Sequence, residues 1–226
     1  MTTFTTDIQL VYVLAAACFV VGLHLMNSPA TARRGNQIST AGIVIAVVVT
    51  LILLIHDGSV TAAGWAVLIV GSLLGSAVGL YYARTVQMTA MPQLVSMFNA
   101  VGGGAAALVS IHDYIHDESA PGGVLGTISV FTVLDVIIGS VTFTGSIIAA
   151  AKLQGLMTGS PVIIRGGRPL NAALVIIGIG TGAFMLTTAS LPALLIVVLA
   201  SLAFGVTMVL PIGGADMPVV ISLLNA

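Results

Sequence analysis

The sequence predicts an all-α integral membrane protein, a polytopic helical bundle with about eight transmembrane helices, the last one cut short. Composition is the first observation behind this prediction. Of the 226 residues, 58% are hydrophobic and 6% are charged, and the mean hydropathy is +1.18. A soluble domain carries about a quarter charged residues. The second observation is that the apolar residues gather in runs long enough to cross about 30 Å of hydrocarbon.

The predicted spans follow one another along the chain, with polar residues and most prolines in the breaks. They fall at 7–27, 37–56, 60–83, 91–111, 124–150, 171–189 and 191–211, and an eighth begins near 217. Small residues pattern several of these spans, as in the stripe Gly71, Gly75 and Gly79. Such stripes are typical of closely packed membrane helices. In the run 102–107, loosening of the helix is an alternative interpretation.

The positive charges predict how the chain is oriented. All six Lys and Arg residues fall in odd-numbered loops between the predicted spans: Arg33, Arg34, Arg84, Lys152, Arg165 and Arg168. Cytoplasmic loops carry an excess of Lys and Arg. We therefore expect a multi-pass protein of the inner (plasma) membrane with its N-terminus outside and its odd-numbered loops in the cytoplasm.

Two ten-residue stretches share one pattern, M-P-x-x-[VI]-S-x-[FL]-N-A. Residues 91–100 read MPQLVSMFNA and residues 217–226 read MPVVISLLNA. Proline suits the first turn of a helix, and residues three apart share a helix face. This spacing pairs two polar side chains on each helix: Ser96 with Asn99, and Ser222 with Asn225.

Both stretches follow odd-numbered loops, so the two helices should run parallel, with their asparagines at matching depth. This predicts a shared polar point near the middle of the bilayer. The alternative is that these side chains only hydrogen-bond between packed helices. Asparagine does not titrate, so the shared point would order water or contact a titrating group elsewhere.

Three acidic or basic features are further candidates for chemistry. Asp135 is the one acidic residue well inside a predicted span, where a carboxylate is costly and indicates either function or a hydrogen bond to another helix. Asp216 precedes the second repeat as an expected N-cap. His112 and His116 favour a solvated loop over a weak metal or proton-collecting site. The single cysteine, Cys18, excludes a disulfide framework.

Three motifs carry a resemblance to a known family: MPQLV at 91–95, VTFTGS at 141–146 and IGGADMPVV at 212–220. They resemble the membrane domain of the beta subunit of proton-translocating NAD(P) transhydrogenase. The resemblance implies that residues 1–226 are a transmembrane proton-translocating domain. It also implies that a soluble NADP-binding domain follows beyond this sequence. In that family, hydride transfer between NAD(H) and NADP(H) on soluble domains is coupled to proton translocation.

The resemblance also implies roles for individual residues. The implied proton pathway is lined by Asn99, Ser146 and Asn225. Ser96, Ser222 and Asp135 are further candidates from the residues themselves, and Asp135 matches no functional position of the family. The implied region of coupling to the NADP domain contains Asp216, Gly213 and Gly214. Some family members have a titratable histidine where this chain has Asn99, and others carry it on a partner helix. This chain resembles the second kind.

Cofactors and partners follow from the same resemblance. We expect no cofactor and no metal on this chain, with NAD(H) and NADP(H) bound by other domains of the complex. The chain alone would then lack the hydride-transfer site. The expected partners are alpha-type subunits with a histidine-bearing membrane helix, the chain's own NADP-binding domain, a second copy of the complex and the lipid bilayer.

The net charge of −1, without a basic patch, predicts no nucleic-acid partner. The alternative functions are a secondary transporter or ion channel with its site between the two parallel asparagine-bearing helices, and a membrane anchor whose polar residues serve only packing.

Overall fold

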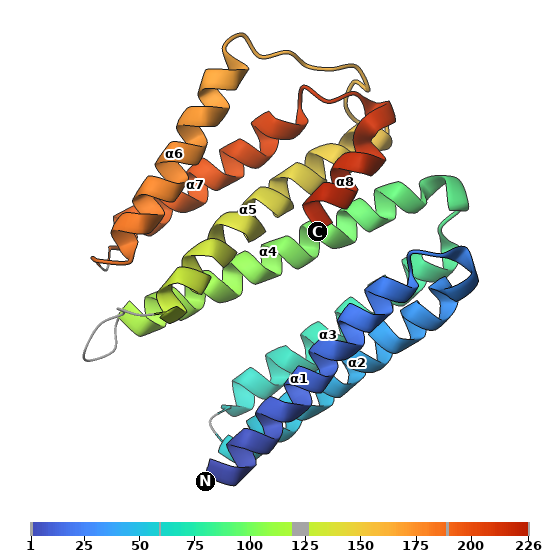
Figure 1. Cartoon of the computed structure of the whole chain (residues 1–226), viewed down its shortest axis with the longest axis vertical. Coiled ribbons are helices and arrows are strands. Elements are labelled where there is room, and N and C mark those ends of the chain that lie inside the picture. The colour runs from blue at the N-terminus through green and yellow to red at the C-terminus, as the bar shows by residue number, and fades with distance from the viewer. Residues whose placement is uncertain (1, 59, 119–126, 189, 226) are drawn as a thin grey trace. The chain divides into compact units, whose positions relative to one another are not determined.

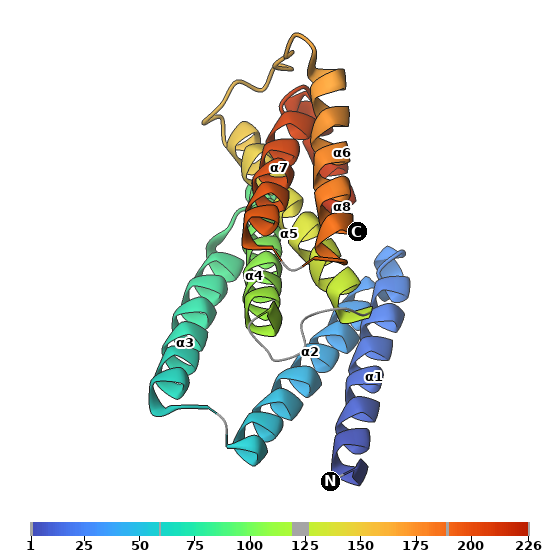
Figure 2. The same ribbon diagram turned by 90° about the vertical axis from the view of Figure 1, so that its left-hand side faces the viewer.

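The computed structural model describes residues 2–58, 60–118, 127–188 and 190–225, and within these ranges every regular secondary-structure element is a helix (Figures 1 and 2). Its α-helices are α1 (Thr2–Leu25), α2 (Pro29–Asp57), α3 (Ala62–Thr85), α4 (Met91–Glu118), α5 (Thr127–Leu153), α6 (Gly167–Met185), α7 (Leu191–Val209) and α8 (Met217–Asn225). Seven described helices, α1 to α7, are long and apolar enough to cross a membrane. The predicted fold class is therefore confirmed, and every predicted span coincides with a helix.

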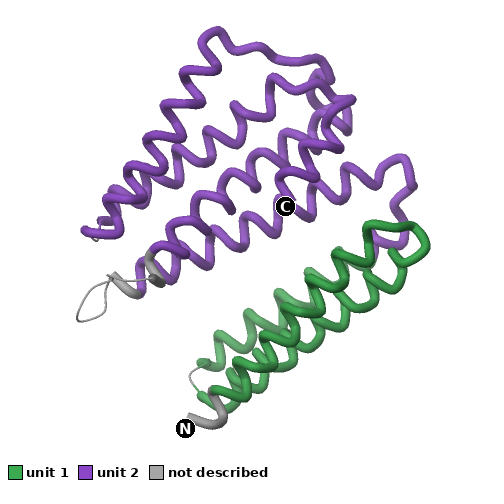
Figure 3. Tube along the Cα trace, in the orientation of Figure 1, with its two compact units in different colours: residues 1–80 green, residues 81–226 purple. Residues whose placement is uncertain are grey.

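The chain divides into two compact units, residues 1–80 and residues 81–226 (Figure 3). In the first unit, α1 packs against α2 through glycines. A Cβ atom on Gly35 would lie 2.6 Å from the carbonyl oxygen of Gly22, and one on Gly42 would lie 3.0 Å from that of Ala15. Only glycine permits so close an approach of two backbones.

The glycines of helix α3, unlike those of α1 and α2, are not packed against another helix among the described residues. Helix α3 has no buried residue in the described part of the chain, and a Cβ atom at Gly71, Gly75 or Gly79 would meet nothing within 4 Å. The predicted close packing at this stripe is therefore not made by the described residues. A cavity of about 650 Å³, almost entirely apolar, is lined by α2 and α3 residues that include Leu51 and Trp65.

In the second unit, α5 packs against both α4 and α7, and α7 packs against α6 (Figures 1 and 2). Glycines again set the close contacts. A Cβ atom on Gly139 of α5 would lie 2.6 Å from the carbonyl oxygen of Gly103 on α4, and one on Gly205 of α7 would lie 2.5 Å from that of Val141. Gly103 and Gly104 therefore serve helix packing, and α4 continues unbroken through them.

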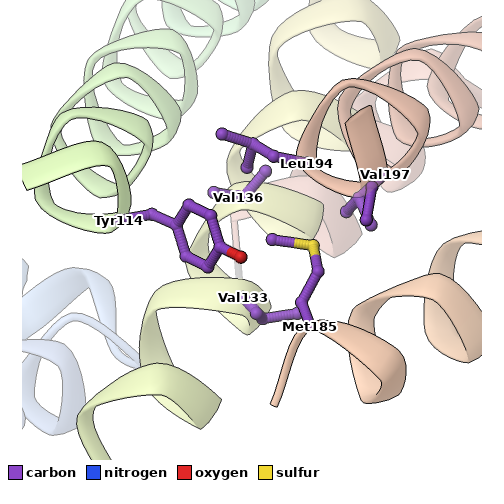
Figure 4. Close-up of a cluster of buried hydrophobic side chains, with 7 residues drawn as sticks. Tyr114, Val133, Val136, Met185, Leu194 and Val197 are labelled. Carbon is purple, nitrogen blue, oxygen red and sulfur yellow. The ribbon is translucent and has the colours of Figure 1, made fainter. Parts of the chain in front are cut away.

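Two buried clusters fix this bundle. At one end, Tyr114 packs among side chains of α5, α6 and α7 (Figure 4): Val133, Val136, Met185, Leu194 and Val197. The backbone N–H of Ser190 donates to the Tyr114 hydroxyl at 3.0 Å, which satisfies that buried group. At the other end, α8 is held by a second cluster formed by Ala149, Val209, Met217, Val220 and Ile221. The short α8 packs against α5 and α4, with Val209 at the end of α7 completing the cluster.

Candidate functional site

The two sequence repeats begin in the same local structure. A 3₁₀ turn, η1 (Met88–Ala90), leads into α4, and another, η2 (Gly214–Asp216), leads into α8. The residues before these turns have nearly equal dihedral angles, φ −76° and ψ 151° at Gln87 and φ −71° and ψ 154° at Gly213. Proline is the second residue of each following helix. The two stretches that are similar in sequence are therefore also similar in local structure.

The first repeat contributes to a hydrogen-bonded cluster between α4 and α5. The Ser96 hydroxyl donates to the backbone carbonyl of Ser146 at 2.7 Å, and the Asn99 amide nitrogen donates to the Ser146 hydroxyl at 3.0 Å. Ser96 and Ser146 are fully buried and Asn99 is half-buried. We call Ser96, Asn99 and Ser146 the polar cluster. At 1.5 Å per residue, Asn99 lies roughly 12 Å along α4 from its first residue.

Further polar contacts lie on either side of this cluster along the interface of α4 and α5, which run antiparallel. We call this row of contacts the polar seam. At one end, Gln93 Nε2 donates to the carbonyl oxygen of Leu153 at 3.2 Å. At the other end, the Ser110 hydroxyl lies 3.4 Å from a carboxylate oxygen of Asp135. The Gln93 side-chain oxygen is buried and has no hydrogen-bond partner among the described residues. Polar contacts thus recur along the whole α4–α5 interface.

Asp135 lies on the exposed side of this seam. The alternative in which it hydrogen-bonds a serine on another helix fits its contact with Ser110. It is not joined to the polar cluster by any described hydrogen bond. Its role in a proton pathway stays a prediction.

The second repeat lies against α5 near the polar cluster. A Cβ atom on Gly145, the residue before Ser146, would lie 3.0 Å from a methyl carbon of Leu224 on α8. Helix α8 therefore passes α5 at the level of Ser146, and Asn225 is the residue that follows Leu224. In the described part of the chain, Ser222 and Asn225 are exposed and form no hydrogen bond with the polar cluster. The shared polar point stays a prediction.

The segment before α8 is docked on the loop after α5. The backbone N–H of Gly214 donates to the carbonyl oxygen of Gly159 at 2.8 Å, and that of Val162 donates to Leu210 at 3.0 Å. Asp216 immediately precedes α8, as expected of a cap, but its carboxylate is exposed and makes no hydrogen bond to the described residues. The predicted N-cap bond is therefore wrong. The 3₁₀ turn η2 includes Asp216, so this residue lies within a helical turn and not at an extended position before α8.

Lys152 is the functional candidate that sequence reasoning missed. The sequence predicts a loop cation at this position, whereas Lys152 lies in the last turn of α5 with 4% of its surface exposed. Its ammonium donates to three backbone carbonyls, those of Leu210 at 2.5 Å, Ile212 at 2.6 Å and Ser160 at 3.5 Å. We call this arrangement the Lys152 clamp.

Two histidines of α4, His112 and His116, lie close together. His112 and His116 stack with their ring centroids 6.1 Å apart on exposed turns of α4. Among the described residues, no group of three or more His, Cys, Asp or Glu side chains is placed to hold a metal ion.

Comparison with known proteins places the chain in a family. The family model of the NAD(P) transhydrogenase beta subunit matches residues 8–226. An NAD(P) transhydrogenase subunit beta from Rhodospirillum rubrum is 37% identical over 219 residues, which are 95% of this chain and 46% of that protein. A second match, from a named strain of that species, has the same values. The chain spans less than half the length of these relatives. This chain belongs to the NAD(P) transhydrogenase beta subunit family.

Proposed function

We propose that this chain is the proton-conducting membrane domain of a proton-translocating NAD(P) transhydrogenase. In the complete enzyme, soluble domains exchange a hydride between NAD(H) and NADP(H), and this chain couples that exchange to proton movement. Family membership supports the enzyme class. The single observation that supports the proton role is the buried polar cluster of Ser96, Asn99 and Ser146 inside two apolar spans.

The polar cluster suits proton handling without itself titrating. An unsatisfied polar group in hydrocarbon costs several kcal/mol, so hydroxyls and amides there need partners. Asn99 both donates and accepts, and it has one donor engaged with Ser146. The cluster can therefore order a short water chain or hold a titrating side chain from a partner helix. In this proposal that partner is a histidine on an alpha-type subunit, and Asn99 contacts it.

Coupling in this proposal works by alternating access. Nucleotide changes on the downstream NADP-binding domain bias the position of the segment 213–216, which carries Asp216, Gly213 and Gly214. Since α8 begins directly after this segment, its movement changes which side of the bilayer the polar cluster faces. A ligand shifts such an equilibrium only by its differential affinity for the two states. Asn225 and Ser222 belong to the moving helix.

The Lys and Arg residues and the small-residue stripe of α3 bear on the orientation of the domain and on its neighbours in the membrane. The distribution of Lys and Arg supports odd-numbered loops in the cytoplasm, where the nucleotide domains would lie, and an inner-membrane location. The open small-residue stripe of α3 supports further helices packed against this chain, from alpha-type subunits or a second copy of the complex. The described 650 Å³ cavity is lined by α2 and α3, so it does not support a transporter site between the two asparagine-bearing helices.

The test uses the complete enzyme with all its subunits in proteoliposomes. We expect Asn99→Leu to lower the number of protons moved per hydride by about tenfold, the loss expected when a hydrogen-bonding amide at mid-membrane becomes hydrocarbon. Hydride transfer without a proton gradient should stay within a factor of about two, because it occurs on soluble domains.

Asn36→Leu is the matched control, because Asn36 is an exposed amide near the start of α2 and outside the polar cluster. It should leave the proton-to-hydride ratio unchanged. An Asn99→Leu enzyme that pumps at the ratio of the unchanged enzyme would contradict the proton role of the polar cluster.

A further inference from the structure

The last turn of α5 bonds to the start of the first M-P repeat and to the segment that precedes the second. On one side, the carbonyl oxygen of Leu153 accepts from Gln93, the third residue of the first repeat, at 3.2 Å. On the other side, the ammonium of Lys152 donates to Leu210 and Ile212, just before the second repeat, at 2.5 and 2.6 Å. The first repeat and the segment that leads into the second repeat are thus both bonded to two consecutive residues of α5.

The Lys152 clamp holds the end of α7 by an unusual arrangement. The last carbonyls of a helix have no partner within the helix and lie at the negative end of its dipole. Leu210 follows the last residue of α7, and Lys152 supplies it with a charged donor. Within the described residues no carboxylate pairs with Lys152. Among those residues, the positive charge of this buried ammonium is therefore balanced only by the partial negative charges of backbone carbonyl oxygens, which the loop holds in place.

The clamp also lies on the same helix as the polar cluster. Ser146, which binds both Ser96 and Asn99, is six residues before Lys152, or roughly 9 Å along α5. Gly205 of α7 lies against Val141 of α5, on the side of Ser146 that faces away from Lys152. A displacement of the segment 210–216 would therefore act on the last turn of α5, and the same helix carries Ser146 about two turns earlier.

We propose that Lys152 is a positioning residue for proton coupling: its ammonium ties the segment 210–216 to α5, so that movement of that segment reaches the polar cluster. This inference rests on the proposed function. It assigns to Lys152 no contact with a proton, a nucleotide or a substrate. Its prediction is that removing the ammonium releases the segment and separates proton movement from hydride transfer.

The experiment uses the complete enzyme in proteoliposomes, with Cys18 replaced by Ala and Ala215→Cys as a reporter on the exposed segment. We expect Lys152→Met to raise the rate at which a membrane-impermeant maleimide labels residue 215 by about tenfold, since charge-assisted hydrogen bonds are lost. The same change should lower the proton-to-hydride ratio by about fivefold, with the gradient-free hydride rate within a factor of about two.

Two variants separate positioning from stability alone. Lys152→Arg keeps a cation that donates to carbonyls and should restore most of the ratio. Arg165→Met removes an exposed cation of the loop after α5 and should change neither readout. If Lys152→Met does not assemble, Lys152→Gln, which is neutral and keeps an amide donor, takes its place with the same expected directions.

Each other outcome overturns the inference. Faster labelling with an unchanged ratio would make Lys152 a residue of structural importance only, and unchanged labelling would mean that the segment is held without it. Failure of both Met and Gln variants to assemble, with Arg assembling, would assign Lys152 to folding. Failure of the proposed function looks different, because Asn99→Leu would then leave the ratio unchanged as well.

Discussion

Replacing Asn225 by leucine is expected to abolish proton-coupled transhydrogenation while hydride exchange between the soluble domains continues. In the proposed mechanism, the amide of Asn225 belongs to the shared polar point at the level of Ser146. The close approach of Leu224 to Gly145 supports this position. Leucine would replace it by hydrocarbon that a proton does not cross, so the coupled rate should fall below about one hundredth of that of the unchanged enzyme. The measurement is coupled turnover in proteoliposomes, compared with the gradient-free hydride rate.

Val219→Leu is the control for this prediction, because Val219 is an exposed apolar residue of the same helix, with 72% of its surface accessible. It tests whether α8 tolerates added volume, and coupled turnover should be retained. Coupled turnover of Asn225→Leu at the rate of the unchanged enzyme would mean that Asn225 has no part in conduction.

The second large effect is expected on stability, from Gly139→Ala. A Cβ atom there would lie 2.6 Å from the carbonyl oxygen of Gly103 and 2.8 Å from the backbone nitrogen of Ala107. Because backbone atoms cannot yield as a flexible side chain does, α4 and α5 must separate, at a cost of about 1–3 kcal/mol in the free energy of unfolding. The bonds of Ser96 and Asn99 to Ser146 cross this same interface.

Thermal unfolding of the detergent-purified complex measures this effect. Gly139→Ala should lower the midpoint by several degrees, at about 2–4 °C per kcal/mol for chains of this size. Gly180→Ala is the matched control: Gly180 is also helical, and its added Cβ would meet nothing within 4 Å. That change should be neutral or stabilising by up to about 1 kcal/mol. Equal midpoints for the two variants would show that α4 and α5 do not pack as described.

The sequence was sufficient to predict the helices but not how their side chains meet. In hydrocarbon, the backbone N–H and C=O groups of a single span must hydrogen-bond to one another, which a helix achieves. Each predicted apolar run therefore coincides with a helix. The repeated M-P pattern likewise predicted two equivalent helix starts. The Ser96 and Asn99 face was predictable from three-residue spacing, whereas its partner Ser146 entered only through resemblance to a family.

Other features depend on tertiary contacts that no local pattern encodes. A lysine in the last turn of a helix ordinarily reaches water or its own helix end, and nothing near Lys152 in sequence indicates carbonyls about 60 residues away. The cap expected of Asp216 was wrong because η2 precedes α8 without a break. Glycine stripes predicted close packing in general, yet Gly139 and Gly103 meet within the chain while Gly71 and Gly75 meet nothing described.

The most direct test of the account is whether positions 99 and 225 face each other in the intact enzyme. Asn99→Cys and Asn225→Cys, combined in a background in which Cys18 is replaced by Ala, would be treated with thiol cross-linkers of graded length, and the pair Asn99→Cys with Ser146→Cys is the positive control. We predict that a short linker joins 99 to 225. If the control pair is linked and no linker joins 99 to 225, the two asparagines do not share a polar point, and the proposed proton pathway is wrong.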